Sequence, residues 1–165
     1  MKVLVAYMSQ TGNTRKIAEA IYDAIPQPKE MRRVEDVTSL EGYDLSFLGF
    51  PIHGYGPDRK ARAFLETQVK NRTIALFITH MAPEGAPLLQ EWIQKFSDAA
   101  IGANIIGIFD CQGQVRRLVK TFMRLSLKSK ERKWARLDSS QGQPDATRLE
   151  RARTFAKEIV SKFRT

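Results

Sequence analysis

The stretch KVLVAYMSQTGNTRKIAEAIYDAI, residues 2–25, joins an apolar run to a helical pattern through a short polar loop. The run from Lys2 to Met8 is typical of a strand that is covered on both faces. The loop, Ser9 to Thr14, leads into apolar residues that recur at helical spacing from Ile17 to Ile25, and prolines at positions 26 and 28 end the helix. We therefore predict a strand, a polar loop and a helix in direct succession.

The same succession repeats along the chain. Apolar runs alternate with stretches of helical periodicity, which indicates a parallel sheet with helices on both faces. We predict an α/β fold with a single doubly wound five-stranded parallel sheet, in one domain over residues 1–165, with an extended loop at 128–146 in the last crossover. The expected strands are Lys2–Met8, Glu30–Val37, Leu45–Phe50, Thr73–Thr79 and Asn104–Phe109. The later expected helices lie at 58–68, 88–96 and 149–163.

Length and composition exclude several classes of protein. The chain has 165 residues, of which 42% are hydrophobic and one is a cysteine. Folding at this length buries roughly two-thirds of the unfolded chain's surface, enough for a substantial core. One cysteine excludes an intramolecular disulfide framework and any metal site built on several thiolates, and we predict no metal site. We expect neither a signal peptide nor an apolar run of the ~20 residues that a membrane span needs, and predict a cytoplasmic protein.

The loop after the first strand is the strongest candidate for a ligand site. Open parallel sheets bind ligands beyond the carboxyl ends of their strands. Hydroxyl and amide side chains and a glycine at a helix N-terminus can wrap a phosphate, because backbone N–H groups and the helix dipole supply positive charge there. An ordinary helix N-cap is the alternative interpretation. The motifs G-x-x-x-x-G-K-[ST] and G-x-G-x-x-G do not occur after a strand, which counts against a nucleotide triphosphatase and a tightly bound dinucleotide.

This loop resembles the flavodoxin phosphate loop, S/T-x-T-G-x-T, and Asp44–Ile52 resembles that family's third strand and the start of its first flavin loop. The resemblance covers about residues 1–113 and implies a flavodoxin-like sheet in the order 2-1-3-4-5 that holds FMN non-covalently. The cofactor-binding residues that it implies in the phosphate loop are Ser9, Gln10, Thr11, Gly12, Asn13 and Thr14. Those that it implies beside the isoalloxazine ring are Pro51, Ile52, His53, Gly54, Tyr55 and Gly56 in the first flavin loop, and Thr79, His80, Met81, Ala82 and Gly85 in the second.

Three residues at this edge are weak candidates for a catalytic role. Tyr55, between two glycines, could stack on the flavin or pack on its own neighbours. His53 could lie near the ring, although an exposed loop histidine is the commoner case. Cys111 could be a reactive thiol at the end of the fifth strand, with a semi-buried small core residue as the alternative.

The positive charge is concentrated in one segment. The whole chain carries a formal charge of +9, and residues 115–136 hold nine basic residues and one acidic residue, a net +8. We expect the apolar residues of this segment to form a helix face that packs on the sheet. These residues are Val115, Leu118, Val119, Phe122, Met123 and Leu125.

A basic segment containing a tryptophan suits an acidic partner. We expect an acidic redox protein, such as a ferredoxin-like protein, as its partner, and contact of 115–136 with a membrane surface as the second possibility; nucleic acid is the least favoured, since no recognition motif is present. Two departures from electron-carrier flavodoxins argue against a carrier of the usual sort: the second flavin loop has no tyrosine, and the acidic surface is missing.

Three functions stay open at this point. The favoured one is an FMN-containing protein that transfers electrons to or from a redox partner protein. The alternative is an FMN-dependent oxidoreductase that acts on a quinone- or tetrapyrrole-like substrate at a membrane surface, because Arg117–Lys130 loosely resembles a stretch of flavodoxin-like protoporphyrinogen oxidases. A flavin-free binding module is the third, and the intact phosphate loop counts against it.

Overall fold

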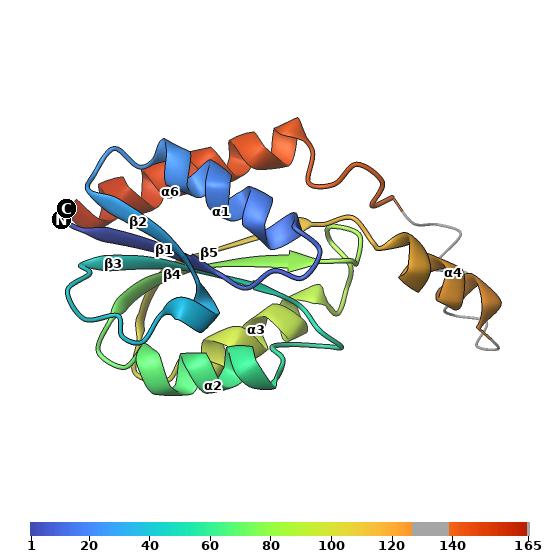
Figure 1. The fold of residues 1–165 in the computed structure, drawn as a ribbon, viewed down its shortest axis with the longest axis horizontal. Coiled ribbons are helices and arrows are strands. Elements are labelled where there is room, and N and C mark those ends of the chain that lie inside the picture. The colour runs from blue at the N-terminus through green and yellow to red at the C-terminus, as the bar shows by residue number, and fades with distance from the viewer. Residues whose placement is uncertain (127–138, 165) are drawn as a thin grey trace.

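The computed structural model describes residues 1–126 and 139–164. A five-stranded sheet lies between two layers of helices, with α1 and α6 on one face and α2 and α3 on the other (Figure 1). The strand order is β2-β1-β3-β4-β5, and each neighbouring pair is parallel. The strands are β1 (Val3–Tyr7), β2 (Lys29–Arg33), β3 (Leu45–Pro51), β4 (Thr73–His80) and β5 (Asn104–Gln112). The helices are α1 (Asn13–Ala24), the short 3₁₀ helix η1 (Val34–Asp36), α2 (Arg59–Gln68), α3 (Leu89–Ala99), α4 (Arg117–Leu125) and α6 (Ala146–Arg164). The predicted fold class and strand order are confirmed.

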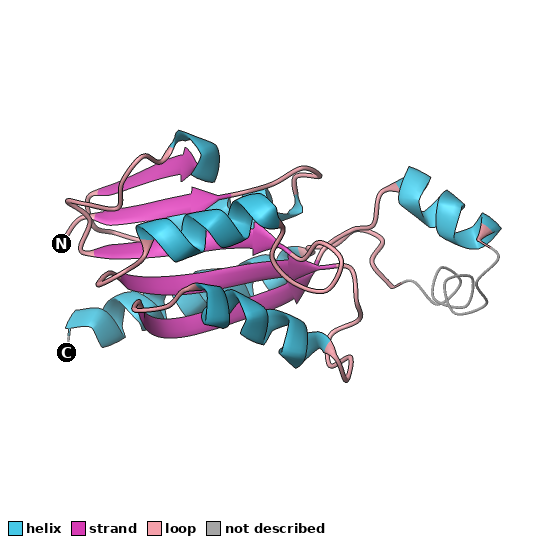
Figure 2. Ribbon diagram, turned by 90° about the horizontal axis from the view of Figure 1, so that it is seen from below, coloured by secondary structure: helices cyan, strands magenta, loops and turns pink. Residues whose placement is uncertain are grey.

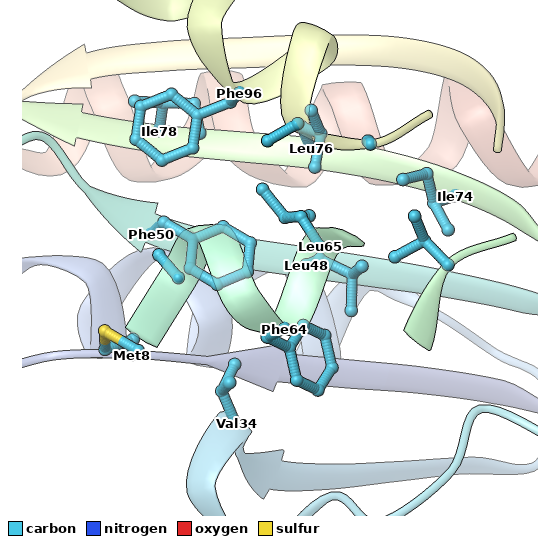
Figure 3. Close-up of a cluster of buried hydrophobic side chains, with 14 of the residues drawn as sticks. Met8, Val34, Leu48, Phe50, Phe64, Leu65, Ile74, Leu76, Ile78 and Phe96 are labelled. Atoms are coloured by element: carbon cyan, nitrogen blue, oxygen red, sulfur yellow. The ribbon is translucent and has the colours of Figure 1, made fainter. Parts of the chain in front are cut away.

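The central strands β1, β3 and β4 are apolar at most positions because both of their faces are buried. In β1, Val3 and Val5 pack toward α1 and α6, whereas Leu4 and Ala6 pack toward α2 and α3. Successive side chains of a strand point to opposite faces, so a continuous apolar run is what a doubly covered strand requires. The same alternation in β3 and β4 builds the core between the sheet and α2 and α3, part of which is drawn in Figure 3.

One glycine in β3 is required by close packing. A Cβ atom on Gly49 would lie 1.9 Å from the ring of Phe77 in β4, closer than any real contact. Phe77 is fully buried, so its ring has no room to move aside. The glycine therefore lets the ring of Phe77 pack against β3, the strand that leads into the first flavin loop.

Two strand ends differ from the prediction by more than one residue. The edge strand β2 ends at Arg33, and residues 34–36 form η1 in place of the predicted continuation to Val37. In contrast, β5 is three residues longer than predicted, because its pairing with β4 continues until His80 lies opposite Gln112. The longer strand places Cys111 inside the sheet.

The prediction that the helix after β5 packs on the sheet is wrong. Figures 1 and 2 show α4 standing beyond the carboxyl end of the sheet, away from both helical layers. The sheet face next to β5 is covered by α6, whose residues Ala152 and Ala156 are fully buried against it. Small side chains bring α6 close to the sheet and to α1, and this leaves no sheet surface for α4.

Most of the predicted loop at 128–146, together with the basic residues and Trp134 between 127 and 138, lies outside the described residues. In the part of the chain that the structure describes, no helix has the length and apolar character needed to cross a membrane.

Candidate functional site

The three predicted cofactor loops follow β1, β3 and β4, and the carboxyl ends of these parallel strands meet at one edge of the sheet (Figure 1). The chain leaves β1 toward β2 on one side and reaches β3 on the other, so the strand order reverses beside β1. Flavodoxin is the standard example of a sheet in this order, with its ligand at the switch point between β1 and β3. The predicted loops therefore lie at the position where such a sheet binds its ligand.

The phosphate loop presents a helix N-terminus suited to an anion. Gly12 precedes α1 with a φ of 90°, a left-handed conformation that favours glycine. Its N–H donates to Ser9 Oγ at 3.1 Å, which closes the loop. Among the described residues, no side chain caps α1, and its first turn contains no carboxylate. The first N–H groups of a helix have no partner within it, so this end can accept the oxygens of a phosphate.

Two predicted phosphate ligands turn their side chains elsewhere. The hydroxyl of Thr14 is buried and lies 2.8 Å from the hydroxyl of Thr79 in β4. The amide of Asn13 donates to the carbonyl of Gln114 at 2.9 Å. As residues of the first turn of α1, both still have backbone N–H groups without a partner within the helix, and the side chains of Gln10 and Thr11 are exposed. The sequence motif marked this loop but did not distinguish backbone from side-chain contacts.

The first flavin loop is a tight turn that rests on α3. Gly54 has a φ of 65°, and the N–H of His53 donates to the carbonyl of Gly56 at 3.0 Å. The ring of Tyr55 lies 5.2 Å from that of Trp92, and Lys95 donates to the Tyr55 carbonyl at 3.0 Å. Tyr55 is nevertheless 68% exposed, so one face of an aromatic ring is available at this edge.

The second flavin loop is held from inside by His80. The ring of His80 is buried, with Nδ1 2.8 Å from the carbonyl of Ala82 and Nε2 3.2 Å from a carboxylate oxygen of Asp110. Gln112 donates to the carbonyl of Met81 at 3.1 Å, and the Met81 side chain is exposed. Both ring nitrogens of His80 thus serve to position the loop.

An ion-pair cluster also fixes this loop from outside. Glu84 accepts from Arg148 at 2.8 Å and from Arg151 at 3.1 Å, and both arginines belong to α6. Sequence reasoning missed this contact, because the partners are more than sixty residues apart and no local pattern links them. The terminal helix therefore contributes to the shape of the cofactor edge.

Cys111 is a core residue. Its side chain is fully buried, and burial, followed by the nearby carboxylates of Glu84 and Asp110, raises the pKa of its thiol to about 12. Because the thiolate is the reactive form, this thiol is inert at neutral pH. Of the two interpretations of Cys111, the small core residue fits the structure.

The segment after β5 lies against the phosphate loop. A Cβ atom on Gly113 would be 2.6 Å from the Asn13 side chain, and a guanidinium nitrogen of Arg116 donates to the carbonyl of Gln10. The charge pattern of the sequence places the basic segment outside the cofactor loops, but its first arginine touches one of them. A permanent positive charge beside this loop favours a bound anion.

A helix N-terminus without a side-chain cap, at the switch point of a doubly wound sheet, is typical of mononucleotide-binding α/β proteins. A family model of the flavodoxin domain matches residues 4–157. The flavodoxin-like domain-containing protein BilS of Clostridioides difficile (strain CD3) is 34% identical over 173 residues, with 98% of each chain covered. The chain therefore belongs to the flavodoxin family.

Solved structures agree with this assignment. Oxidised flavodoxin 2 from Bacillus cereus matches with a TM-score of 0.62 at 20% identity, over 98% of this chain and 99% of that one. A flavoprotein from Lactobacillus acidophilus, crystallised in complex with FMN, matches with a TM-score of 0.53 at 21% identity, over 66% of this chain and 92% of that one. These likenesses show the fold, and FMN is the cofactor of the family.

Proposed function

We propose that this chain binds FMN and transfers electrons to or from a redox partner protein in the cytoplasm. When bound, FMN supplies the electron-transfer chemistry, and the chain binds, orients and shields it. The observation that carries the proposal is the N-terminus of α1 at Gly12, which, among the described residues, has neither a side-chain cap nor a carboxylate in its first turn.

Each loop has a distinct task in this proposal. The N–H groups at the start of α1 and the Ser9 and Thr11 hydroxyls hold the phosphate. The exposed Tyr55 and Met81 provide apolar surface to either side of the flavin ring. Trp92 keeps the first flavin loop in place, and the contacts of His80 and Glu84 keep the second, so the site is organised before the cofactor arrives.

Electron transfer fits this edge better than covalent catalysis. Within the described ranges, Cys111 is buried as a thiol and the His80 ring is occupied with the loop. His53 lies exposed in the first flavin loop. A nucleophile paired with a base is the arrangement that covalent catalysis needs, and these residues do not form one.

Two glycines provide a matched test of the cofactor site. Gly12 and Gly42 have φ values of 90° and 82°, and a Cβ atom added to either would meet no other atom within 4 Å, so alanine meets the same backbone strain at both. Both alanine variants should lose about 1 kcal/mol of unfolding free energy. Only Gly12→Ala should lose FMN affinity, and its affinity for riboflavin, which lacks the phosphate, should change little. A purified wild-type chain that is colourless and rejects added FMN would refute the proposal.

The electron-transfer step is tested with an acidic ferredoxin. Reduction of the FMN-loaded chain by reduced ferredoxin should be fast at low ionic strength and slow as salt screens the charges. Steady-state turnover of a quinone or a porphyrinogen without any protein acceptor would instead support the oxidoreductase alternative.

A further inference from the structure

Helix α4 exposes an apolar face that nothing in the described structure covers. Leu118, Phe122 and Leu125 are 73%, 76% and 76% exposed, although they are among the largest apolar side chains of the chain. They are spaced four and three residues apart and therefore share one face of the helix. Contiguous exposed apolar surface of this kind marks an interaction site.

The opposite face of the same helix is basic. Lys120 and Arg124 are spaced four residues apart, two positions away from the apolar series, which places them on the other side of the helix, whereas Arg116 precedes α4 and donates to the carbonyl of Gln10 in the phosphate loop. Together with Arg117 they bring the charge of residues 115–126 to +4, because this stretch contains no acidic residue. The helix is thus divided cleanly into an apolar half and a cationic half.

The base of α4 is fixed to the cofactor edge. Val115 is buried, and its N–H donates to Ser140 Oγ at 3.0 Å. The N–H of Gln114 donates to the carbonyl of Gln143 at 3.0 Å. This hydrogen bond joins the segment that precedes α4 to the segment that precedes α6. Figure 2 shows that α4 lies beyond the carboxyl ends of the strands, at the end of the sheet that carries the flavin loops. A partner surface that binds α4 would therefore lie next to the end of the sheet that carries the flavin loops.

We propose that α4 is an interfacial helix that binds an anionic lipid surface. Its apolar side chains would enter the boundary between headgroups and acyl chains, while Lys120 and Arg124 contact lipid phosphates. An anionic lipid surface contacts both the apolar half and the cationic half of the helix, whereas a purely acidic protein surface would contact only the cationic half. Pairing with α4 of a second copy is opposed by the like charges on the two helices. The nine-residue helix cannot span a bilayer, so binding is peripheral and reversible.

The test is sedimentation of the full FMN-loaded chain with lipid vesicles. Vesicles of phosphatidylcholine mixed with phosphatidylglycerol should bind the chain at low salt, and vesicles of phosphatidylcholine alone should bind it far more weakly. The double variant Lys120→Gln, Arg124→Gln should lose about 25-fold in affinity for the anionic vesicles, at about fivefold for each basic residue. The double variant Leu118→Ser, Phe122→Ser should lose at least about tenfold.

A matched control separates α4 from surface hydrophobicity in general. Ile101 is 74% exposed, as much as the apolar residues of α4, but lies in the loop between α3 and β5 at the other end of the sheet. Ile101→Ser should bind anionic vesicles like the wild type. Unchanged FMN affinity in every variant shows that each is folded.

Two results would overturn the proposal. One is a wild-type chain that stays in the supernatant with anionic vesicles at low salt. The other is undiminished vesicle binding by the Leu118→Ser, Phe122→Ser variant. If the wild-type chain does not bind vesicles and the α4 variants exchange electrons with ferredoxin more slowly than the wild type, α4 binds a protein partner instead. Because sedimentation needs no electron acceptor, its outcome is independent of the proposed electron-transfer function.

Discussion

The buried hydroxyl pair between α1 and β4 allows a quantitative test of how the phosphate loop is held. Thr14 and Thr79 are 1% and 4% exposed, and their hydroxyl oxygens lie 2.8 Å apart. Replacing Thr14 by valine keeps the shape of the side chain but leaves the Thr79 hydroxyl buried without this partner. An unsatisfied buried polar group costs about 1–3 kcal/mol. We expect Thr14→Val to lower the free energy of unfolding by that amount.

The double variant provides the decisive comparison. Thr14→Val combined with Thr79→Val removes both hydroxyls, and replacing both partners by apolar groups of the same shape is nearly neutral. Urea unfolding of the wild type, the two single variants and the double variant completes a double-mutant cycle, in which the coupling between the two changes should equal the sum of the two single losses, at least about 2 kcal/mol. The m-value should stay constant across the set, so that the midpoints report stability alone. Strictly additive losses would refute a hydrogen bond shared by the two residues.

The same variant decides which atoms of Thr14 face the phosphate. The structure turns its hydroxyl inward, so FMN affinity in Thr14→Val should stay within a few-fold of the wild type. A large loss of FMN affinity with unchanged riboflavin affinity would instead show that the phosphate needs this hydroxyl.

Further predictions concern charge and reactivity. Arg116→Ala should weaken FMN binding by about two- to fivefold and leave the affinity for riboflavin unchanged. Arg15→Ala should change neither affinity, because the Arg15 guanidinium is paired with Glu19 along α1. Equal losses of FMN affinity in titrations of the two variants would contradict this. Hydrogen bonds to Glu30, of which that from Lys2 has the largest effect, lower the pKa of its carboxyl to about 2, below the usual 4.5. The stability that these hydrogen bonds provide is therefore complete above pH 4.5 and is lost as the pH falls toward 2. Acid titration of Glu30→Gln, followed by circular dichroism, should show a flatter decline than the wild type, and parallel curves would count against the contact. Cys111 should react with a thiol reagent in native protein only as fast as the chain unfolds, and rapid labelling of the folded chain would disprove its burial.

The sheet could be predicted because its signal is local. A strand buried on both faces is apolar at most positions, and runs such as 45–50 and 73–79 are short and bounded by turn residues. The order of the strands and the cofactor loops came from the likeness of residues 9–14 to a known phosphate loop. That motif specifies a backbone conformation, which Gly12 adopts.

The contacts between distant segments could not be predicted. Periodicity showed that α4 has an apolar face, but not that the small residues of α6 already cover the sheet beside β5. In the same way, the packing of Tyr55 on Trp92 joins two segments whose relative position only the folded chain defines. The periodicity of one segment predicts which side chains share a face, but the partner of that face depends on where the other segments pack.

The link between Glu84 and α6 also bears on the order of events during synthesis. Arg148 and Arg151 come late in the chain, so they are synthesised after the five strands of the sheet and all three cofactor loops. A nascent chain that ends before residue 146 would carry the phosphate loop but lack both arginines and the buried face of α6. The second flavin loop would then be without its outer anchor. Cofactor capture should therefore be a late event, completed only when the terminal helix has been made and docked.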